Sequence, residues 1–108
     1  MPQFIEEQLS AIRALCERHG IRRLDLFGSA TGGRFDEKTS DLDFVVDFAD
    51  RSSGYADRYL AVAAGLEALF GRHVDLMTER SIQSSSFKRS VDASRKTIYD
   101  RRDCASAT

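Results

Sequence analysis

Apolar residues recur along this chain with the spacing of a helix in some stretches and of a strand in others. Residues 4–18 carry apolar side chains at intervals of four, three and four, namely Ile5, Leu9, Ile12 and Cys16. This spacing places them on one face of a helix, and Gly20 is suited to end that helix as its C-cap. A second helix is expected over 55–70, closed by Gly71. Its apolar face is formed by Tyr59, Val62, Ala63, Leu66, Leu69 and Phe70.

Residues 21–27, 42–48 and 73–77 alternate as strands do. Successive side chains of a strand point to opposite faces of its sheet. In the second stretch the apolar residues of one face are Leu42, Phe44, Val46 and Phe48. The other face carries Asp41, Asp43 and Val45, and in the third stretch it carries His73, Asp75 and Met77. Strands that alternate with helices, with acids gathered on one sheet face, predict an α/β two-layer domain.

The pattern weakens after Ser81. The apolar residues that allow a further helix are Ile82, Phe87 and Val91. Ser84–Ser86 are poor helix formers and favour a distorted turn instead. Residues 96–99 either extend that helix or add a short edge strand.

Asp41 and Asp43 are either solvated acids at an exposed strand start or ligands of a cation. Two like charges at one strand end repel each other unless a positive group lies between them, and hard divalent cations take oxygen ligands. Gly28 and Ser29 favour the cation. Glycine lets the backbone approach a ligand closely, and a serine between a strand and a helical turn offers a hydroxyl and N–H groups to phosphate. A plain helix cap is the alternative role for Ser29.

Three short motifs carry a resemblance to a known family. The chain resembles the minimal nucleotidyltransferases of the DNA polymerase β superfamily. The motifs that carry the resemblance are Leu26-Phe27-Gly28-Ser29, Ser40-Asp41-Leu42-Asp43 and Val74-Asp75-Leu76, in that order. The order of the parts is specific: Gly-Ser, a polar loop, Asp-x-Asp, and a lone strand aspartate after an intervening helix. The resemblance covers the chain from the first helix to about Asp100. It implies a mixed nucleotidyltransferase sheet with helices packed mainly on one face.

The chain departs from the family's pattern in the segment between the first two motifs. Members often carry an arginine a few residues after Gly-Ser, where this chain has Ala30-Thr31-Gly32-Gly33. The loop before Asp41 is also slightly longer than in many relatives. Arg34 or another basic group is then left to meet the charge of a triphosphate.

The resemblance implies an enzyme that moves a nucleoside monophosphate, AMP from ATP, onto a hydroxyl acceptor. It implies that Asp41, Asp43 and Asp75 are catalytic and bind a pair of Mg²⁺ ions. Gly28 and Ser29 would bind the nucleotide. Such proteins are typically encoded beside HEPN-domain ribonuclease toxins and act as antitoxins by adenylylating a tyrosine. The implied partner is therefore a HEPN-domain protein encoded nearby.

Two other functions were weighed against this enzyme. Asp41-Leu42-Asp43-Phe44-Val45 also matches the Asp-x-Asp-x-Thr/Val pattern of haloacid-dehalogenase-like phosphatases. In those proteins the apolar strand precedes the first aspartate, whereas here it follows, which disfavours that fold. The remaining alternative is a non-catalytic antitoxin or pseudoenzyme of the same fold, which neutralises its partner by occlusion alone.

Composition narrows the class of protein. A length of 108 residues with 42% apolar and 31% charged residues fits one globular domain. We expect this domain over 1–100 and a disordered tail over 101–108. The sequence shows no membrane span and no signal-peptide pattern, so we expect a cytoplasmic protein. A net charge of −1 argues against direct binding to nucleic acid.

Charge is divided unevenly along the chain. Residues 1–79 hold nine Lys/Arg against fourteen Asp/Glu, a net of −5, whereas 80–108 hold seven against three, a net of +4. The basic end is either a solvated helix face or a surface for a partner. We expect the segment 80–102 to carry much of the partner contact. Its available aromatic anchors are Phe87 and Tyr99, of which Phe87 is the better candidate for the core.

Overall fold

The computed structural model describes residues 3–28, 41–49 and 54–101 of the chain. Its centre is a four-stranded sheet in the order β3-β2-β1-β4. The strands are β1 (Ile21–Phe27), β2 (Leu42–Phe48), β3 (Val74–Thr78) and β4 (Lys96–Asp100). β1 pairs antiparallel with both β2 and β4, whereas β2 and β3 run parallel. The sheet is therefore mixed, as expected.

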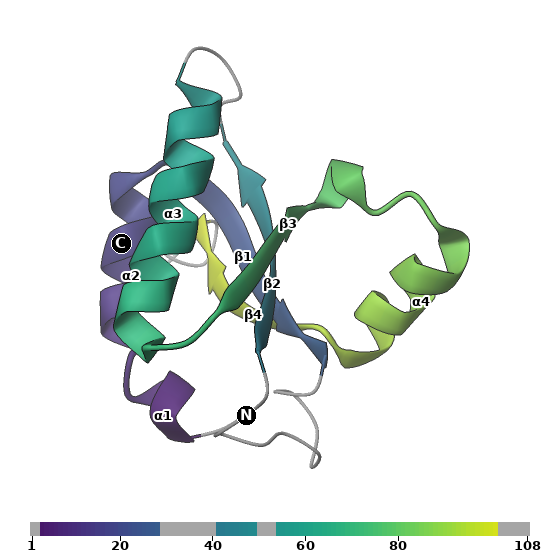
Figure 1. Cartoon of the computed structure of the whole chain (residues 1–108), viewed down its shortest axis with the longest axis horizontal. Coiled ribbons are helices and arrows are strands. Elements are labelled where there is room, and N and C mark those ends of the chain that lie inside the picture. Colours follow the sequence, from purple (N-terminus) through teal and green to yellow (C-terminus); the bar gives the residue numbers. More distant parts are fainter. Residues whose placement is uncertain (1–2, 29–40, 50–53, 102–108) are drawn as a thin grey trace.

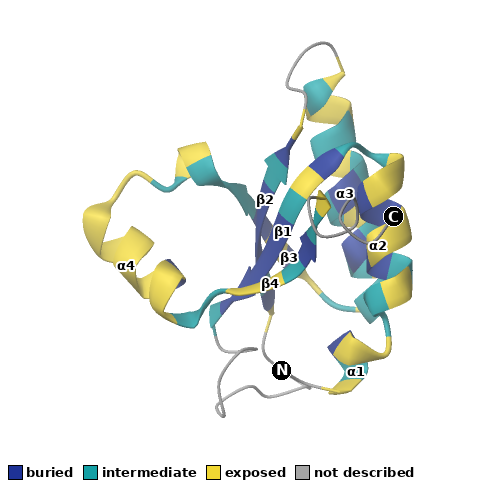
Figure 2. Ribbon diagram, turned by 180° about the vertical axis from the view of Figure 1, so that it is seen from behind, coloured by how far each residue is buried: buried dark blue, intermediate teal, exposed yellow. Residues whose placement is uncertain are grey.

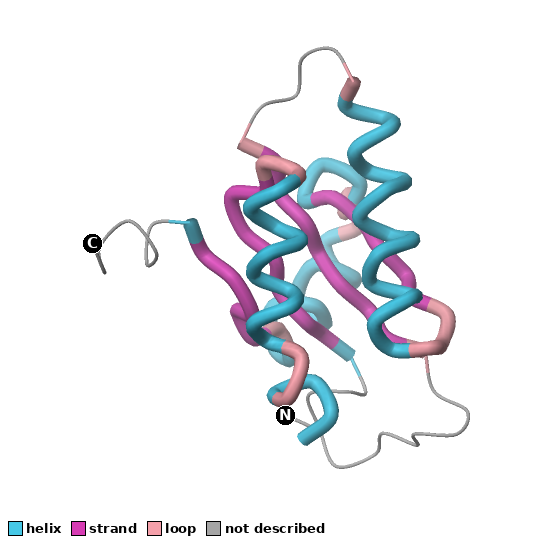
Figure 3. The backbone as a smooth tube through the Cα atoms, turned by 90° about the vertical axis from the view of Figure 1, so that its left-hand side faces the viewer, coloured by secondary structure: helices cyan, strands magenta, loops and turns pink. Residues whose placement is uncertain are grey.

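Helices cover mainly one face of this sheet. α2 (Leu9–Arg18) and α3 (Tyr55–Phe70) lie side by side on that face, and α4 (Ser85–Ser94) lies on the other (Figures 1 and 3). The short helix α1 (Gln3–Glu6) precedes α2, and a 3₁₀ turn, η2 (Glu79–Ser81), follows β3. Within the described residues, no helix has the length and apolar character needed to cross a membrane. This arrangement confirms the predicted α/β fold class.

The main core lies between the sheet and the pair α2 and α3. The core residues of β2 are those that the alternation predicted, Leu42, Phe44, Val46 and Phe48, each exposed by 4% or less. Gly65 lets α3 come close to α2, because a Cβ at that position would lie 2.8 Å from Cδ1 of Leu15. The buried residues of the sheet and of the inner sides of α2 and α3 form one continuous layer (Figure 2).

A smaller apolar cluster covers part of the opposite face. Phe27 and Val45 of the sheet pack there against Val91 of α4, and most of α4 is otherwise exposed (Figure 2). The serines that predicted a distorted turn begin this helix instead. Ser84 is its N-cap, and Oγ of Ser84 accepts a hydrogen bond from the N–H of Phe87 at 3.4 Å. Serine is a poor residue inside a helix but a good one at its start, which explains the difference.

The first helix and the C-terminal strand also refine the expectations. The helix predicted over 4–18 is divided by a turn into α1 and α2. Ile5 is fully buried, and Phe4 packs edge-on against Phe70 with ring centroids 5.8 Å apart. The short helix α1 therefore packs against the core although a turn separates it from α2. Residues 96–100 form the edge strand β4, which was one of the two alternatives. The tail predicted to be disordered lies, beyond Arg101, outside the described residues.

Candidate active site

Three strand ends bring the predicted acids together. The register of the sheet pairs Phe27 of β1 with Asp43 of β2, and Asp43 with Asp75 of β3. Paired residues of neighbouring strands point to the same face, so the side chains of Asp43 and Asp75 are neighbours. Asp41 immediately precedes β2, and its carboxylate lies within 4.8 Å of ligand atoms of His73 and Asp75. The structure thus gathers Asp41, Asp43 and Asp75 on the face opposite α2 and α3.

Among the described residues, no lysine or arginine neutralises the negative charges of this group, and the imidazole of His73 contacts Asp75. No Lys or Arg within residues 3–28, 41–49 and 54–101 forms an ion pair with Asp41, Asp43 or Asp75. Burial, followed by the charge of Asp75 and a hydrogen bond with it, raises the pKa of Asp43 to about 6. An acid with such a pKa is held in its charged form only at a cost, and a bound cation would remove that cost.

His73 lies beside these acids, although its sequence context had predicted no functional role for it. Its Nε2 lies 2.9 Å from Oδ1 of Asp75, and its Nδ1 lies 3.2 Å from Oε2 of Glu67. The hydrogen bond with Asp75 raises the pKa of the imidazole above its ordinary value. The alternation over 73–77 had already placed His73 on the same face as Asp75, and that was the signal for including it.

Gly28 lies directly beside Asp43. Its φ of +79° falls in the left-handed region, and a Cβ there would lie 2.7 Å from Oδ2 of Asp43. Only glycine fits this turn without displacing the carboxylate. The N–H of Gly28 donates to Oγ of Ser94 at 3.0 Å, which ties the end of α4 to the site. Ser29, the other predicted nucleotide-binding residue, lies outside the described residues, as does Arg34.

The donors gathered here suit a hard divalent cation. Asp41, Asp43 and Asp75 supply carboxylate oxygens, the ligands that Mg²⁺ prefers in proteins. Asp41, His73 and Asp75 together offer ligand atoms that all lie within 4.8 Å of one another. Burial, followed by the neighbouring charge of Asp75, raises the pKa of Asp43, and a bound cation would favour its charged form. The residues present therefore fit Mg²⁺.

A hollow lies along α3 and β3. It has a volume of about 520 Å³ and is lined by Tyr55, Ala56, Tyr59, Leu60, Leu76, Met77, Thr78 and Ser81. None of these lining residues is an acid or a base that could hold a metal ion or neutralise a phosphate. The hollow is therefore an apolar surface feature.

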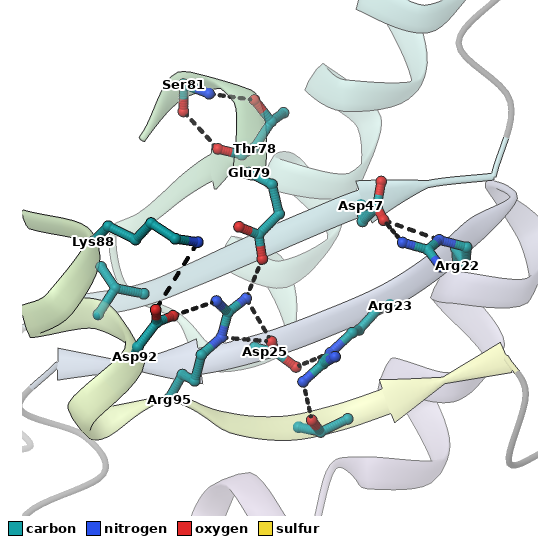
Figure 4. Close-up of polar contacts among 12 residues, drawn as sticks. Arg22, Arg23, Asp25, Asp47, Thr78, Glu79, Ser81, Lys88, Asp92 and Arg95 are labelled. Atoms are coloured by element: carbon teal, nitrogen blue, oxygen red, sulfur yellow. Dashed lines mark hydrogen bonds and ion pairs between the residues drawn. The ribbon is translucent and has the colours of Figure 1, made fainter. Parts of the chain in front are cut away.

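Arg95, in the basic end of the chain, faces inward instead of forming an open surface. Its guanidinium donates to Oδ2 of Asp25 at 2.9 Å and to Oδ1 of Asp92 at 2.7 Å, and it also pairs with Glu79 (Figure 4). The side chain of Asp25 is only 1% exposed and requires a positive partner. Arg23 contributes a second one, with Nε at 3.0 Å from Oδ1 of Asp25. Arg95 is therefore not part of an open basic surface on the segment 80–102.

Of the two aromatic residues proposed as anchors for that segment, Tyr99 lies in the core and Phe87 is exposed. Tyr99 of β4 is 6% exposed and belongs to the main core, whereas Phe87 of α4 is 39% exposed. Phe87 touches the sheet only at its margin, edge-on to Phe27 with ring centroids 6.2 Å apart. The prediction of a core position for Phe87 was wrong, because Val91 is the α4 residue that reaches the buried cluster.

Comparison with known families decides the identity of this fold. Residues 10–102 match the family described as nucleotidyltransferase domain. The chain belongs to this nucleotidyltransferase family. Among its curated relatives, protein adenylyltransferase MntA of Thermococcus cleftensis is 38% identical over 85 residues, which cover 78% of this chain and 83% of the relative.

Solved nucleotidyltransferase structures share the architecture. A structure assigned as a minimal nucleotidyltransferase is 28% identical, with a TM-score of 0.71, and the match covers 87% of this chain and 92% of that one. A complex of tri-AMPylated Shewanella oneidensis HEPN toxin with MNT antitoxin matches with a TM-score of 0.61 at 21% identity, over 94% of this chain and 77% of that one. At this identity the second match bears on the fold alone.

Proposed function

We propose that this chain transfers AMP from ATP to a hydroxyl of a HEPN-domain partner protein encoded nearby, and so acts as the antitoxin of the pair. The observation that carries the proposal is the meeting of Asp41, Asp43 and Asp75 beside Gly28, with no lysine or arginine partner among the described residues. The relative named protein adenylyltransferase MntA supports the reaction, and the AMPylated HEPN toxin with its MNT antitoxin supports the partner. A cytoplasmic location is part of the proposal because ATP is abundant there.

Asp41, Asp43 and Asp75 are the residues that would hold a pair of Mg²⁺ ions. Bound Mg²⁺ lowers the pKa of an attacking hydroxyl and stabilises negative charge on the phosphates. The acceptor oxygen forms a bond to the α-phosphorus of ATP while the bond to the bridging oxygen of the β-phosphate breaks, and pyrophosphate leaves. We expect the carboxylate of Asp75, which is 50% exposed, to accept the proton of the hydroxyl.

Gly28 contributes the space in which nucleotide and carboxylates meet. Because it carries no side chain and any Cβ would collide with Asp43, the backbone of β1 ends in direct contact with the acids. Ser29 follows at once in the sequence, and we propose that Gly28 and Ser29 together bind the phosphates of ATP. This role is part of the proposal for the site as a whole.

Co-expression with the neighbouring HEPN-domain protein tests the proposed function. The intact mass of that partner is measured after co-expression with the wild-type chain, with Asp43→Asn, and with Asp57→Asn as the control. Asp57 is an exposed acid in the first turn of α3, remote in sequence from the three motifs. We expect the mass of one or more AMP groups on the partner with the wild-type chain and the control, and none with Asp43→Asn.

The same experiment separates the enzyme from the non-catalytic alternative. If the partner co-purifies with the wild-type chain and is neutralised without any added mass, occlusion explains the antitoxin activity and the proposed transfer is refuted. Equal added mass with Asp43→Asn would instead contradict the assignment of the site.

A further inference from the structure

We propose that His73 is a metal ligand of this site, together with Asp41 and Asp75, and that it makes the site prefer Mn²⁺ to Mg²⁺. The inference rests on the proposed function in that it concerns the same metal site. It goes beyond it because a site of three aspartates contains oxygen donors only, whereas an imidazole adds a nitrogen donor.

The distances around His73 suit a ligand. In an octahedral site with bonds of about 2.1 Å, adjacent ligand atoms lie about 3.0 Å apart and opposite ones about 4.2 Å apart. Nε2 of His73 lies 2.9 Å from Oδ1 of Asp75. The ligand atoms of Asp41, His73 and Asp75 all lie within 4.8 Å of one another. These three side chains are therefore close enough for us to propose one ion in contact with all of them.

The other side of the imidazole provides a second, independent observation. A histidine that binds a metal usually donates its remaining ring N–H to a carboxylate or a carbonyl, which fixes the tautomer and the ring orientation. Nδ1 of His73 lies 3.2 Å from Oε2 of Glu67 in α3. That oxygen is itself held by the N–H of Val74 at 3.1 Å. Glu67 thus orients His73 so that Nε2 faces the two aspartates.

The donor set decides which ion is preferred. Carboxylate oxygens suit Mg²⁺ and Mn²⁺ alike, whereas imidazole suits transition metals and offers little to Mg²⁺. One nitrogen donor among the oxygens should therefore raise the affinity for Mn²⁺ more than the affinity for Mg²⁺. An exposed site with 50% exposure of Asp75 also leaves room for waters and phosphate oxygens on the same ion.

Calorimetric titration with MnCl₂ or MgCl₂ alone, without nucleotide or partner, tests the proposal. The variants are His73→Asn and, as a matched control, His19→Asn, which changes the other histidine of the chain at the C-cap of α2. We expect His73→Asn to weaken Mn²⁺ binding about tenfold or more while Mg²⁺ binding changes little, by analogy with other losses of metal-site residues. His19→Asn should change neither. Glu67→Gln should give a smaller loss in the same direction as His73→Asn.

A spectroscopic readout completes the test. Co²⁺ bound to the wild-type chain should show visible absorption bands that shift or weaken in His73→Asn and stay unchanged in His19→Asn. Equal weakening of Mn²⁺ and Mg²⁺ binding in His73→Asn would overturn the proposal, since His73 would then only position Asp75. Unchanged Mn²⁺ binding in that variant would also overturn it. Because nucleotide and partner are absent, the proposed AMP transfer can fail without affecting this result.

Discussion

Two groups of carboxylates lie on the same face of the sheet, and they differ in whether an arginine or lysine of the described residues pairs with them. Near the middle of that face, Asp25, Glu79 and Asp92 surround the guanidinium of Arg95 (Figure 4). At the end of the same face, Asp41, Asp43 and Asp75 meet without an Arg or Lys partner among the described residues. The first group is paired with arginine as folded, whereas the second is the group that we propose binds Mg²⁺. This contrast separates the acids that stabilise the fold from those that we propose are catalytic.

Removal of Arg95 should have the largest effect on stability. Arg95→Ala leaves the buried carboxylate of Asp25 with Arg23 alone, and loss of one partner of a buried ion pair costs about 3 kcal/mol. The free energy of unfolding is measured by urea titration, with Arg89→Ala on the exposed surface of α4 as the control, expected within about 0.5 kcal/mol of wild type. Equal stability of the two variants would mean that the Arg95 cluster is no more structural than an exposed charge.

Addition of Mg²⁺ should give the next largest effect, and only through the open group. At a Mg²⁺ concentration about a hundred times Kd, binding to the native state adds about 2.7 kcal/mol to the free energy of unfolding. We expect a higher melting temperature with Mg²⁺ for the wild-type chain, a much smaller rise for Asp43→Asn, and a full rise for Asp92→Asn. Asp92 is an acid of the closed group, so its loss should leave the metal site intact. An undiminished rise in Asp43→Asn would remove Asp43 from the site.

A comparison of Gly28 with Gly54 isolates the effect of a Cβ at position 28 that would clash with the Asp43 carboxylate. Both have a left-handed φ, +79° and +83°, but a Cβ on Gly54 meets nothing within 4 Å. Each change to alanine should cost about 1 kcal/mol from backbone strain. Gly28→Ala should cost more than Gly54→Ala and also weaken Mg²⁺ binding, because the new methyl group displaces the Asp43 carboxylate. Equal Mg²⁺ affinity in the two variants, measured by calorimetry, would show that this contact does not matter.

The smallest expected effect is the cost of ionising Asp43 in the metal-free site, which arises from its burial first and from the charge of Asp75 second. Because the folded state raises the pKa of Asp43 to about 6, ionisation of this group destabilises the native state as pH rises from about 4 to 6. Asp43→Asn should therefore be more stable than wild type in a metal-free buffer at pH 7, by about 1 kcal/mol after allowance for solvent screening. The difference should vanish below about pH 4. A variant that is less stable at pH 7 would show that the ionised carboxylate of Asp43 does not destabilise the metal-free native state.

Local patterns predicted much of the fold and the three acids of the site. The alternation in 42–48 determined which β2 residues face the core, and the same alternation put Asp43 on the opposite face. Asp75 could be joined to it because a helix between two strands commonly returns the chain to a neighbouring parallel position. His73 could have been included on the same grounds, since it lies two residues before Asp75.

The closed group could not be predicted in this way. Asp25 and Arg95 are 70 positions apart, and no local spacing connects a strand residue with the end of a distant helix. Formal charge along the sequence suggested a free basic surface because it does not record which cations are already paired. The start of α4 was missed for a similar reason, since a serine run breaks a helix or caps it depending on position.

Transfer of label from ATP to the HEPN-domain partner is the most direct test of the proposed activity. The purified chain is incubated with its partner, Mg²⁺, and ATP labelled with phosphorus-32 at either the α- or the γ-phosphate. We predict that the partner acquires label from α-labelled ATP only, and that Asp43→Asn abolishes this incorporation while Asp92→Asn retains it. Incorporation from γ-labelled ATP, or none from either with a folded wild-type chain, would contradict nucleotidyl transfer at this site.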